Sequence, residues 1–192
     1  MPFSQSTQLS AIICFAEQLR PKSVLDVGTG MGQYGFLLRT NLEHLNLFEI
    51  NGSSGKLRDR SEWAIKIDGI EGCKTYLTPV HEYSYNKVFV GNALDILPTI
   101  RVASYDLVMA IDILEHLSKA DGKIFLAQCF RIASRAVLVS TPKLFVQQEI
   151  PANPLENHRS LWTQADLLEL GFTSTLPNEN SWVVHSLATG ST

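Results

Sequence analysis

Five short apolar runs recur along this chain of 192 residues, and helical patterns separate them. The runs span residues 23–28, 64–71, 86–93, 105–112 and 135–142. Several are apolar at consecutive positions, which is typical of strands that are covered on both faces of a parallel sheet. The clearest helical pattern spans 118–133, where Ile124, Ala127, Cys129 and Phe130 are expected to share a buried side. The alternation predicts one doubly wound α/β domain, a reasonable size for a single core.

Further helices and strands are predicted near both ends of the sequence. Residues 9–19 read as a helix that precedes the first strand. The stretch TQADLLELG predicts a second short helix, with Thr163 as its N-cap, Asp166 completing a capping box and Gly171 in the left-handed position after its end. The segments 172–177 and 181–188 then predict an antiparallel pair that closes one edge of the sheet.

Two stretches lack a regular pattern. Residues 41–62 read as an insertion loop between the helix that follows the first strand and the second strand, with NGSSG at 51–55 as an exposed loop. Residues 143–162 form a long irregular connection after the fifth strand. Because loops of that length inside a compact domain tend to be functional, we expect a lid there.

Composition narrows the class of protein. The net charge of −3 and a pI near 5.9 disfavour a dedicated nucleic-acid surface. No apolar run reaches the ~20 residues that a membrane span needs, and the first twenty residues make a poor signal peptide. Cys14, Cys73 and Cys129 lack the spacing of a disulfide framework or zinc knuckle, so we expect buried thiols and a cytoplasmic location.

The most informative motif is VLDVGTGMGQYG, residues 24–35, which places glycines at 28, 30, 32 and 35 directly after a strand. Gly30, Gly32 and Gly35 satisfy the spacing of a dinucleotide loop, although that match alone is weak. A P-loop is excluded because no Gly-Lys-Ser/Thr follows. Tight packing between strand and helix is the alternative that involves no ligand.

Carboxylates near this loop favour a ligand without a pyrophosphate. Asp26 lies two residues before Gly28, where it would repel a pyrophosphate and attract an ammonium group. Glu71 ends the next strand and is placed to bind ribose hydroxyls; Glu49 is the runner-up. Asn92, within GNA at 91–93, ends the third strand and can bond an adenine amino edge. This set predicts a pocket for adenosine joined to a charged amino acid.

The ordered motifs resemble the class I S-adenosylmethionine-dependent methyltransferases, which have a Rossmann-like fold. The matching pieces are LDVGTGMG, DGIE, VGNALDILP, YDLVMAIDILEHL and VLVSTP, within residues 20–145. The resemblance implies S-adenosylmethionine as cofactor and a set of residues that hold it: Asp26, Gly28, Thr29, Gly30, Gly32, Glu71, Asn92, Ala93 and Asp112. The family often has Asp where this chain has Asn92.

A second group of polar residues follows the fourth strand. Asp112, Glu115 and His116 would share a face if a helix begins there, and they could form a base cluster or most of a hard-metal site. The segment resembles methyltransferases of ubiquinone biosynthesis and of small-RNA 3′ ends. In the RNA group a later His before Trp-Thr completes a divalent-metal site, and here His158 precedes Trp162 and Thr163 at similar spacing. The segment departs from that group in having Asp112 where Glu is usual.

Each of these residues also has a structural interpretation. Asp112 could cap a helix, and Glu115 and His116 could simply pack at a helix start. His44, His81 and His185 are expected at the surface or in loops. Tyr83 and Tyr85 could line a substrate pocket, but we expect them to pack a helix onto the sheet.

The sequence thus predicts a methyltransferase that uses S-adenosylmethionine, with Asp112, Glu115, His116 and His158 at the reacting end and an oxygen or nitrogen nucleophile as acceptor. A divalent metal is possible and is left open. Two alternatives remain: an NAD(P)-dependent reductase, and a non-catalytic adaptor with the same fold. The sequence identifies neither the acceptor, small molecule or macromolecule, nor the oligomeric state; a membrane partner is not expected and nucleic acid is not favoured.

Overall fold

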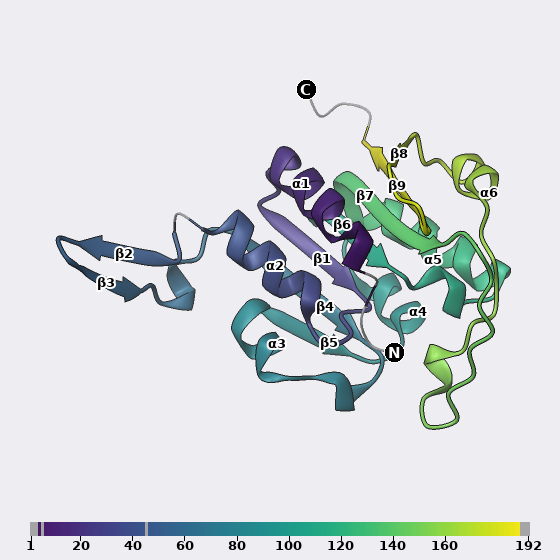
Figure 1. Cartoon of the computed structure of the whole chain (residues 1–192), viewed down its shortest axis with the longest axis horizontal. Helices are drawn as coiled ribbons and strands as arrows, with labels where there is room; N and C mark the ends of the chain where they lie inside the picture. Colours follow the sequence, from purple (N-terminus) through teal and green to yellow (C-terminus); the bar gives the residue numbers. More distant parts are fainter. Residues whose placement is uncertain (1–3, 5, 45, 189–192) are drawn as a thin grey trace.

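The computed structural model of this chain describes residues 4, 6–44 and 46–188 and is built on a seven-stranded sheet (Figure 1). Five strands pair in parallel, and at one edge two further strands are added by antiparallel pairing, as predicted. Their spatial order is β5 (Lys87–Val90), β4 (Lys66–Glu71), β1 (Ser23–Val27), β6 (Tyr105–Ile111), β7 (Ala133–Pro142), β9 (Ser181–Leu187) and β8 (Ser174–Leu176). The doubly wound α/β class is confirmed.

The strand order contains a topological switch. From β1 the chain moves outward to β4 and β5, then returns to the other side of β1 to form β6. In register, Val27 pairs with Ile70 on one side and with Ala110 on the other. In open sheets of this type, ligands bind beyond the carboxyl ends of the strands at such a switch. The glycine-rich loop directly follows β1 at this point.

Helices cover both faces of the sheet (Figure 1). Strand β6 has apolar side chains on both of its faces, and each face needs a covering layer. Leu107 and Met109 belong to one core cluster, and Val108 and Ala110 belong to the other. The first cluster packs against α1 (Leu9–Leu19), α2 (Gln33–Leu42) and the end of α3 (Pro79–Ser84). The second packs against α4 (Ala93–Ile96), α5 (Lys119–Ile132) and α6 (Gln164–Glu169).

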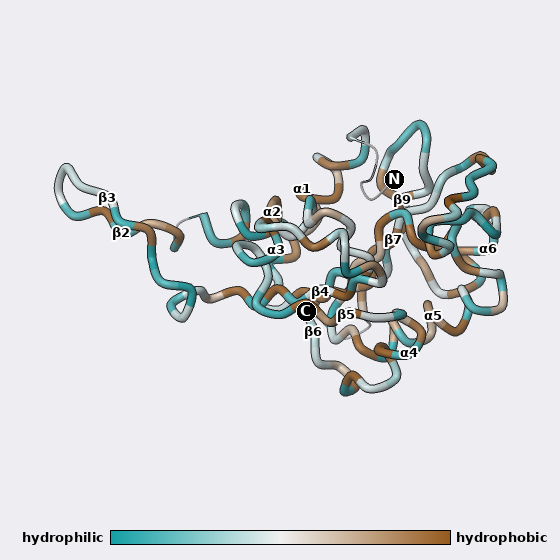
Figure 2. The backbone as a smooth tube through the Cα atoms, turned by 90° about the horizontal axis from the view of Figure 1, so that it is seen from below, coloured by the Kyte–Doolittle hydropathy of each residue, from teal (hydrophilic) through white to brown (hydrophobic). Residues whose placement is uncertain are grey.

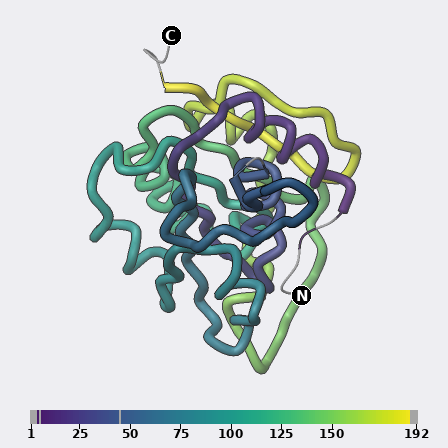
Figure 3. The backbone as a smooth tube through the Cα atoms, turned by 90° about the vertical axis from the view of Figure 1, so that its left-hand side faces the viewer, coloured from purple at the N-terminus to yellow at the C-terminus, as the bar shows by residue number. Residues whose placement is uncertain are grey.

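Short 3₁₀ turns connect these elements. They are η1 (Ser6–Gln8), η2 (Arg60–Glu62), η3 (Lys74–Tyr76), η4 (Leu97–Thr99), η5 (Leu114–His116) and η6 (Pro154–Glu156). The first helix and the last strand lie side by side (Figures 1 and 3), and the rings of Phe15 and His185 stand 4.5 Å apart. No helix in the described ranges is both long and apolar enough to cross a membrane.

Several local expectations are confirmed or corrected. Thr163 and Asp166 form the predicted capping box of α6, and Gly171 has a positive φ of 107°. In α5 the predicted buried face is half right: Cys129 is buried and Phe130 is partly buried against the core, whereas Ile124 and Ala127 are exposed. The buried residues of the helix are Gly122, Phe125, Leu126, Cys129 and Ile132. Among the cysteines, Cys129 is buried as expected, whereas Cys14 is exposed and Cys73 is intermediate.

The insertion of residues 41–62 is more regular than predicted. It contains an antiparallel hairpin of β2 (Phe48–Asn51) and β3 (Ser54–Leu57), which projects from one end of the molecule (Figures 1 and 2). Only Gly52 and Ser53 form the turn, so NGSSG belongs mostly to strands. All eight strand residues are exposed, as expected of a surface insertion.

Candidate functional site

The glycine-rich loop connects β1 to α2. Gly28, Gly30 and Gly32 all have positive φ, at 81°, 54° and 89°, a region that residues with a side chain rarely occupy. At Gly28 a Cβ atom would also lie 2.0 Å from Cδ1 of Ile113. The glycines of the motif therefore have two structural roles. They allow the backbone to adopt positive φ, and at Gly28 they allow the Ile113 side chain, after β6, to pack against the loop.

Glu71 lies at the end of β4 and binds this loop directly. Its Oε2 accepts a hydrogen bond from Gly30 N at 2.7 Å and from Thr29 Oγ1 at 3.3 Å, and its Oε1 accepts one from Cys73 N at 2.8 Å. Burial raises the pKa of this carboxyl above its usual value. The competing Glu49 lies exposed in β2, in the hairpin that projects away from the sheet (Figure 1). The geometry therefore favours Glu71 for the predicted ribose contact.

Asp26 lies beneath the loop and is almost fully buried. Its carboxylate accepts a 2.6 Å hydrogen bond from the hydroxyl of Tyr85, which in turn accepts one from Gly35 N at 3.1 Å. Burial raises the pKa of Asp26 to about 7. The charge-based argument against a pyrophosphate is therefore weaker than the sequence suggested, because this carboxyl is partly neutral near pH 7. Tyr85 packs α3 on the sheet, as predicted.

His81 corrects a prediction. It was expected at the surface, but its side chain is 4% exposed and lies under the loop, with Nε2 3.0 Å from Thr29 Oγ1. His185 was also expected in a loop and instead lies in β9, whereas His44 is exposed as predicted. His81 is buried because it lies one helical turn before Tyr85, on the face of α3 that packs against the rest of the protein.

Asn92 and Ala93 lie beyond the end of β5, which is shorter than predicted. Asn92 is the N-cap of α4, with Oδ1 accepting from Leu94 N at 3.0 Å, and its side chain is exposed. The adjacent Gly91 has a φ of 149°. This segment lies at the same edge of the sheet as Glu71, since Glu71 pairs with Val90 in the register.

Asp112 follows β6 with a φ of 54°, a strained conformation for a residue with a side chain. Its Oδ1 accepts a 2.6 Å hydrogen bond from Ser140 Oγ, and its Oδ2 accepts a 2.7 Å bond from Gln8 Nε2. It is not a helix cap, because the next element is η5 with Ile113 at the capping position. Gln8 is fully buried and comes from the N-terminal turn η1, a contact that no sequence motif indicated.

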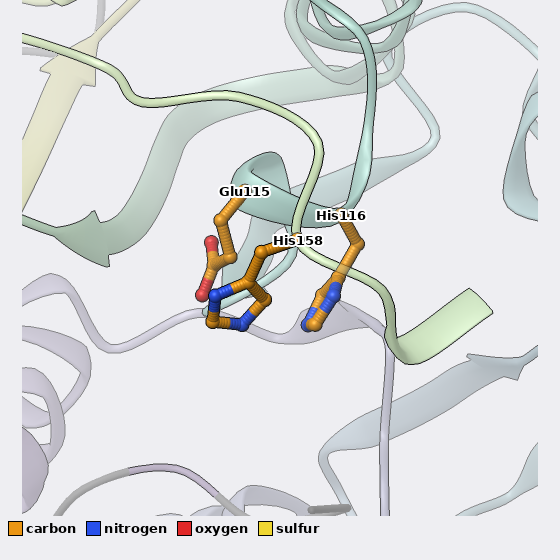
Figure 4. A group of neighbouring side chains, drawn as sticks. All are labelled: Glu115, His116 and His158. Atoms are coloured by element: carbon orange, nitrogen blue, oxygen red, sulfur yellow. The ribbon is translucent and has the colours of Figure 1, made fainter. Parts of the chain in front are cut away.

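Glu115, His116 and His158 come together in the structure (Figure 4). One ligand atom from each lies within 4.8 Å of the others, and the two imidazole centroids are 5.0 Å apart. The backbone brings the segments together, because the amides of Arg159 and Ser160 both donate to the Glu115 carbonyl. The grouping predicted across forty residues of sequence is therefore present.

The protonation of these groups follows from their surroundings. Burial, with Asp112 nearby, raises the pKa of Glu115 well above its usual value, and burial lowers the pKa of His116. His158 Nδ1 lies 2.6 Å from the Val146 carbonyl, which can only accept, so Nδ1 carries a proton, and in the neutral tautomer Nε2 carries the lone pair. His116 Nδ1 is buried and has no partner among the described residues.

These three side chains could act as proton acceptors or hold a metal ion. Two imidazoles and one carboxylate are a ligand set used by divalent iron and related metals. The unpartnered Nδ1 of His116 fits such a role, because a buried nitrogen without a hydrogen bond is costly unless something binds it.

Residues 143–162 cross the carboxyl ends of the strands, from β7 toward β4. Asn153 Nδ2 donates to Tyr76 Oη at 3.1 Å, and a Cβ placed at Gly72 would lie 2.6 Å from Leu155. Further along, the Trp162 indole donates to the Leu114 carbonyl and packs on Gly122. The segment thus touches both the end of β4 next to Glu71 and the turn that carries Glu115.

The similarity of this chain to known proteins is found in its structure rather than in its sequence. No family model matches the sequence, and no curated protein matches it. The N-terminal domain of EvdMO1, solved in the presence of SAH and D-fucose, aligns with 97% of this chain and 84% of its own, at 16% identity and a TM-score of 0.65.

Two further structures align over most of both chains. The PH0226 protein from Pyrococcus horikoshii OT3 covers 93% of this chain and 86% of its own, at 16% identity and a TM-score of 0.62. The magnesium protoporphyrin IX methyltransferase from Synechocystis PCC 6803, with bound SAH, covers 94% and 81%, at 11% identity and a TM-score of 0.59. At these identities the likeness establishes the fold, which this chain shares with S-adenosylmethionine-dependent methyltransferases.

Proposed function

We propose that this chain is a methyltransferase that uses S-adenosylmethionine and methylates an oxygen or nitrogen nucleophile. The observation that carries the proposal is the contact of Glu71 with Gly30 at the topological switch. A carboxylate that ends the strand beside a left-handed glycine loop is placed for the ribose of an adenosine ligand. The shared fold, including neighbours solved with SAH, supports the same conclusion.

The proposed cofactor site comprises the residues around the loop. Glu71 would bind the ribose hydroxyls, Asn92 and Ala93 would lie at the adenine, and Gly28, Gly30 and Gly32 would let the backbone approach the ligand. Asp26 and Thr29 would support the loop from below, because both side chains are buried and hydrogen-bonded there. Asp112 would face the amino-acid end beyond β6.

Bound S-adenosylmethionine supplies an electrophilic methyl group, so the chain must align a nucleophile behind that methyl and accept its proton. His158 is the best placed acceptor, because its Nε2 carries a lone pair while Nδ1 is held by the Val146 carbonyl. Asp112, Glu115 and His116 would complete the reacting end. In a metal-dependent variant of this proposal, Glu115, His116 and His158 would hold a divalent ion that binds the nucleophile.

The 143–162 segment would act as the lid over this site. It already contacts the end of β4 through Leu155 and carries His158.

The acceptor would be recognised by such loops or by another chain. The acidic charge balance favours an acceptor other than nucleic acid, and cysteines without disulfide spacing favour the cytoplasm.

The first experiment is calorimetric binding of SAH and, separately, of NAD to the purified chain. We expect SAH alone to bind. Glu71→Gln should weaken binding by roughly 10- to 100-fold, because a hydrogen bond to a charged group contributes about 1.5–3 kcal/mol. Binding of NAD alone would contradict the proposal in favour of a reductase, and binding of neither would favour an adaptor.

A further inference from the structure

Helix α3 presents two side chains to the glycine-rich loop from below. His81 and Tyr85 lie one turn apart, with ring centroids 5.4 Å apart and nearly parallel planes. Tyr85 contacts Asp26 and Gly35, so it holds the strand and the helix that flank the loop. His81 reaches Thr29 within the loop itself. The helix is short, so these contacts account for its placement.

The direction of the hydrogen bonds around His81 follows from one backbone group. Thr78 N–H can only donate, and it lies 3.0 Å from His81 Nδ1, so Nδ1 carries the lone pair. The neutral ring then has its proton on Nε2 and donates it to Thr29 Oγ1 at 3.0 Å. Burial lowers the pKa of His81, which is consistent with a neutral ring.

The next bond in the series reaches Glu71. Because Thr29 Oγ1 accepts from His81, its own proton is free to donate to Glu71 Oε2 at 3.3 Å. The same oxygen accepts from Gly30 N, and Oε1 accepts from Cys73 N. Three donors therefore fix the plane of the carboxylate, and one of them depends on His81.

Two glycines flank this chain of bonds, and Gly69 leaves the space that the Thr29 side chain occupies. A Cβ at Gly69, two residues before Glu71, would lie 2.5 Å from Thr29 Cγ2. A Cβ at Gly32 would lie 3.3 Å from Cε1 of His81. The motif DGIE thus provides space for the Thr29 side chain as well as the carboxylate.

We propose that His81 is a positioning residue of the cofactor site, which acts through Thr29 to orient the Glu71 carboxylate toward the ribose hydroxyls. This inference rests on the proposed function. It assigns a role to a residue outside the matching motifs, and it makes α3 part of the binding machinery.

The test uses two ligands and two substitutions. The ligands are SAH and an SAH analogue that lacks both ribose hydroxyls, measured by calorimetry. His81→Asn keeps an acceptor for Thr78 N but loses the donor to Thr29, whereas His81→Gln keeps an amide donor near the Nε2 position. We expect His81→Asn to weaken SAH binding by roughly 3- to 10-fold, the size of one hydrogen bond. It should leave the analogue unaffected, and His81→Gln should bind both ligands like the wild type.

A second pair of variants separates orientation from folding. Thr29→Val should reproduce the loss seen in His81→Asn, Thr29→Ser should restore binding, and the double variant should be no weaker than either single one. Equal weakening of both ligands by His81→Asn would mean that His81 only supports the fold, and would overturn the inference. So would unchanged SAH binding. Failure of the wild type to bind SAH would instead overturn the proposed function itself.

Discussion

The hydroxyl of Tyr85 donates a 2.6 Å hydrogen bond to the carboxylate of Asp26, joining the end of α3 to the centre of β1. Both side chains are almost completely buried. The bond explains how a carboxyl group is accommodated inside the sheet, and it places the group under the glycine-rich loop. The glycine-rich motif is thereby linked to α3 by residues 59 positions apart.

This relationship predicts a pH-dependent effect of Asp26→Asn. Burial raises the pKa of Asp26 to about 7, so between about pH 4 and 7 the folded state binds more protons than the unfolded state. The contribution of the Asp26 carboxyl to the free energy of unfolding is therefore lost as the pH rises through this window. Asp26→Asn should match the wild type near pH 4 and be more stable above pH 7, by at most roughly 4 kcal/mol at about 1.4 kcal/mol per pKa unit.

Urea unfolding of both proteins across this range measures the difference. Asp95→Asn is the matched control, because Asp95 is an exposed carboxyl in the first turn of α4 and the same substitution there removes no buried group. A difference between Asp26→Asn and the wild type that does not vary with pH would contradict the assignment.

Gly28 and Gly52 predict different costs for the same substitution. Both have positive φ, but a Cβ at Gly28 would clash with Ile113, whereas a Cβ at Gly52 meets no atom within 4 Å. We expect Gly28→Ala to destabilise by roughly 2–5 kcal/mol, from strain and overpacking, and Gly52→Ala by about 1–2 kcal/mol. Thermal and urea unfolding check this, and Gly28→Ala with Ile113→Ala should recover part of the loss. Equal costs would mean that the loop relaxes away from Ile113.

His158 should be required for methyl transfer and not for cofactor binding. We expect His158→Ala to lower the rate by roughly 10²- to 10⁴-fold, as for loss of a general base, and to leave SAH affinity unchanged. Once an acceptor is found, initial rates with labelled S-adenosylmethionine measure this. The exposed His44 provides the control substitution, which should change neither quantity.

Removal of divalent ions distinguishes the two roles of the cluster. A chelator should leave the rate unchanged if His158 acts alone as base, and should abolish it if Glu115, His116 and His158 hold a metal. An unaltered rate in His158→Ala would exclude both roles.

The proposed lid predicts a kinetic signature. Deletion of residues 151–156 removes the contacts of Asn153 and Leu155 with the segment after β4. We expect both association and dissociation of SAH to become faster, so that affinity changes little while turnover is lost. Stopped-flow binding measures the two rates. A large loss of affinity would indicate that the segment builds the cofactor site rather than covering it.

Much of the fold is predictable because the signals are local. The parallel strands carry runs of apolar residues, and Thr163 with Asp166 forms a capping box from side chains three residues apart. The buried face of α5 was predicted correctly at Cys129 and wrongly at Ile124, because Ile124 and Phe125 are equally apolar, and Trp162 packs on the face that carries Gly122. The hairpin was missed because its strands are short and exposed on both sides.

Local patterns were enough to predict the succession of parallel strands and helices, the glycine loop and the carboxylate that ends β4, since each depends on residues close together in the chain. The folded structure was needed to show that His81 lies under the loop, that Gln8 binds Asp112 and that Glu71 rather than Glu49 meets Gly30. These pairs are far apart in sequence. Whether such groups meet depends on how helices pack across the sheet, which local pattern does not specify.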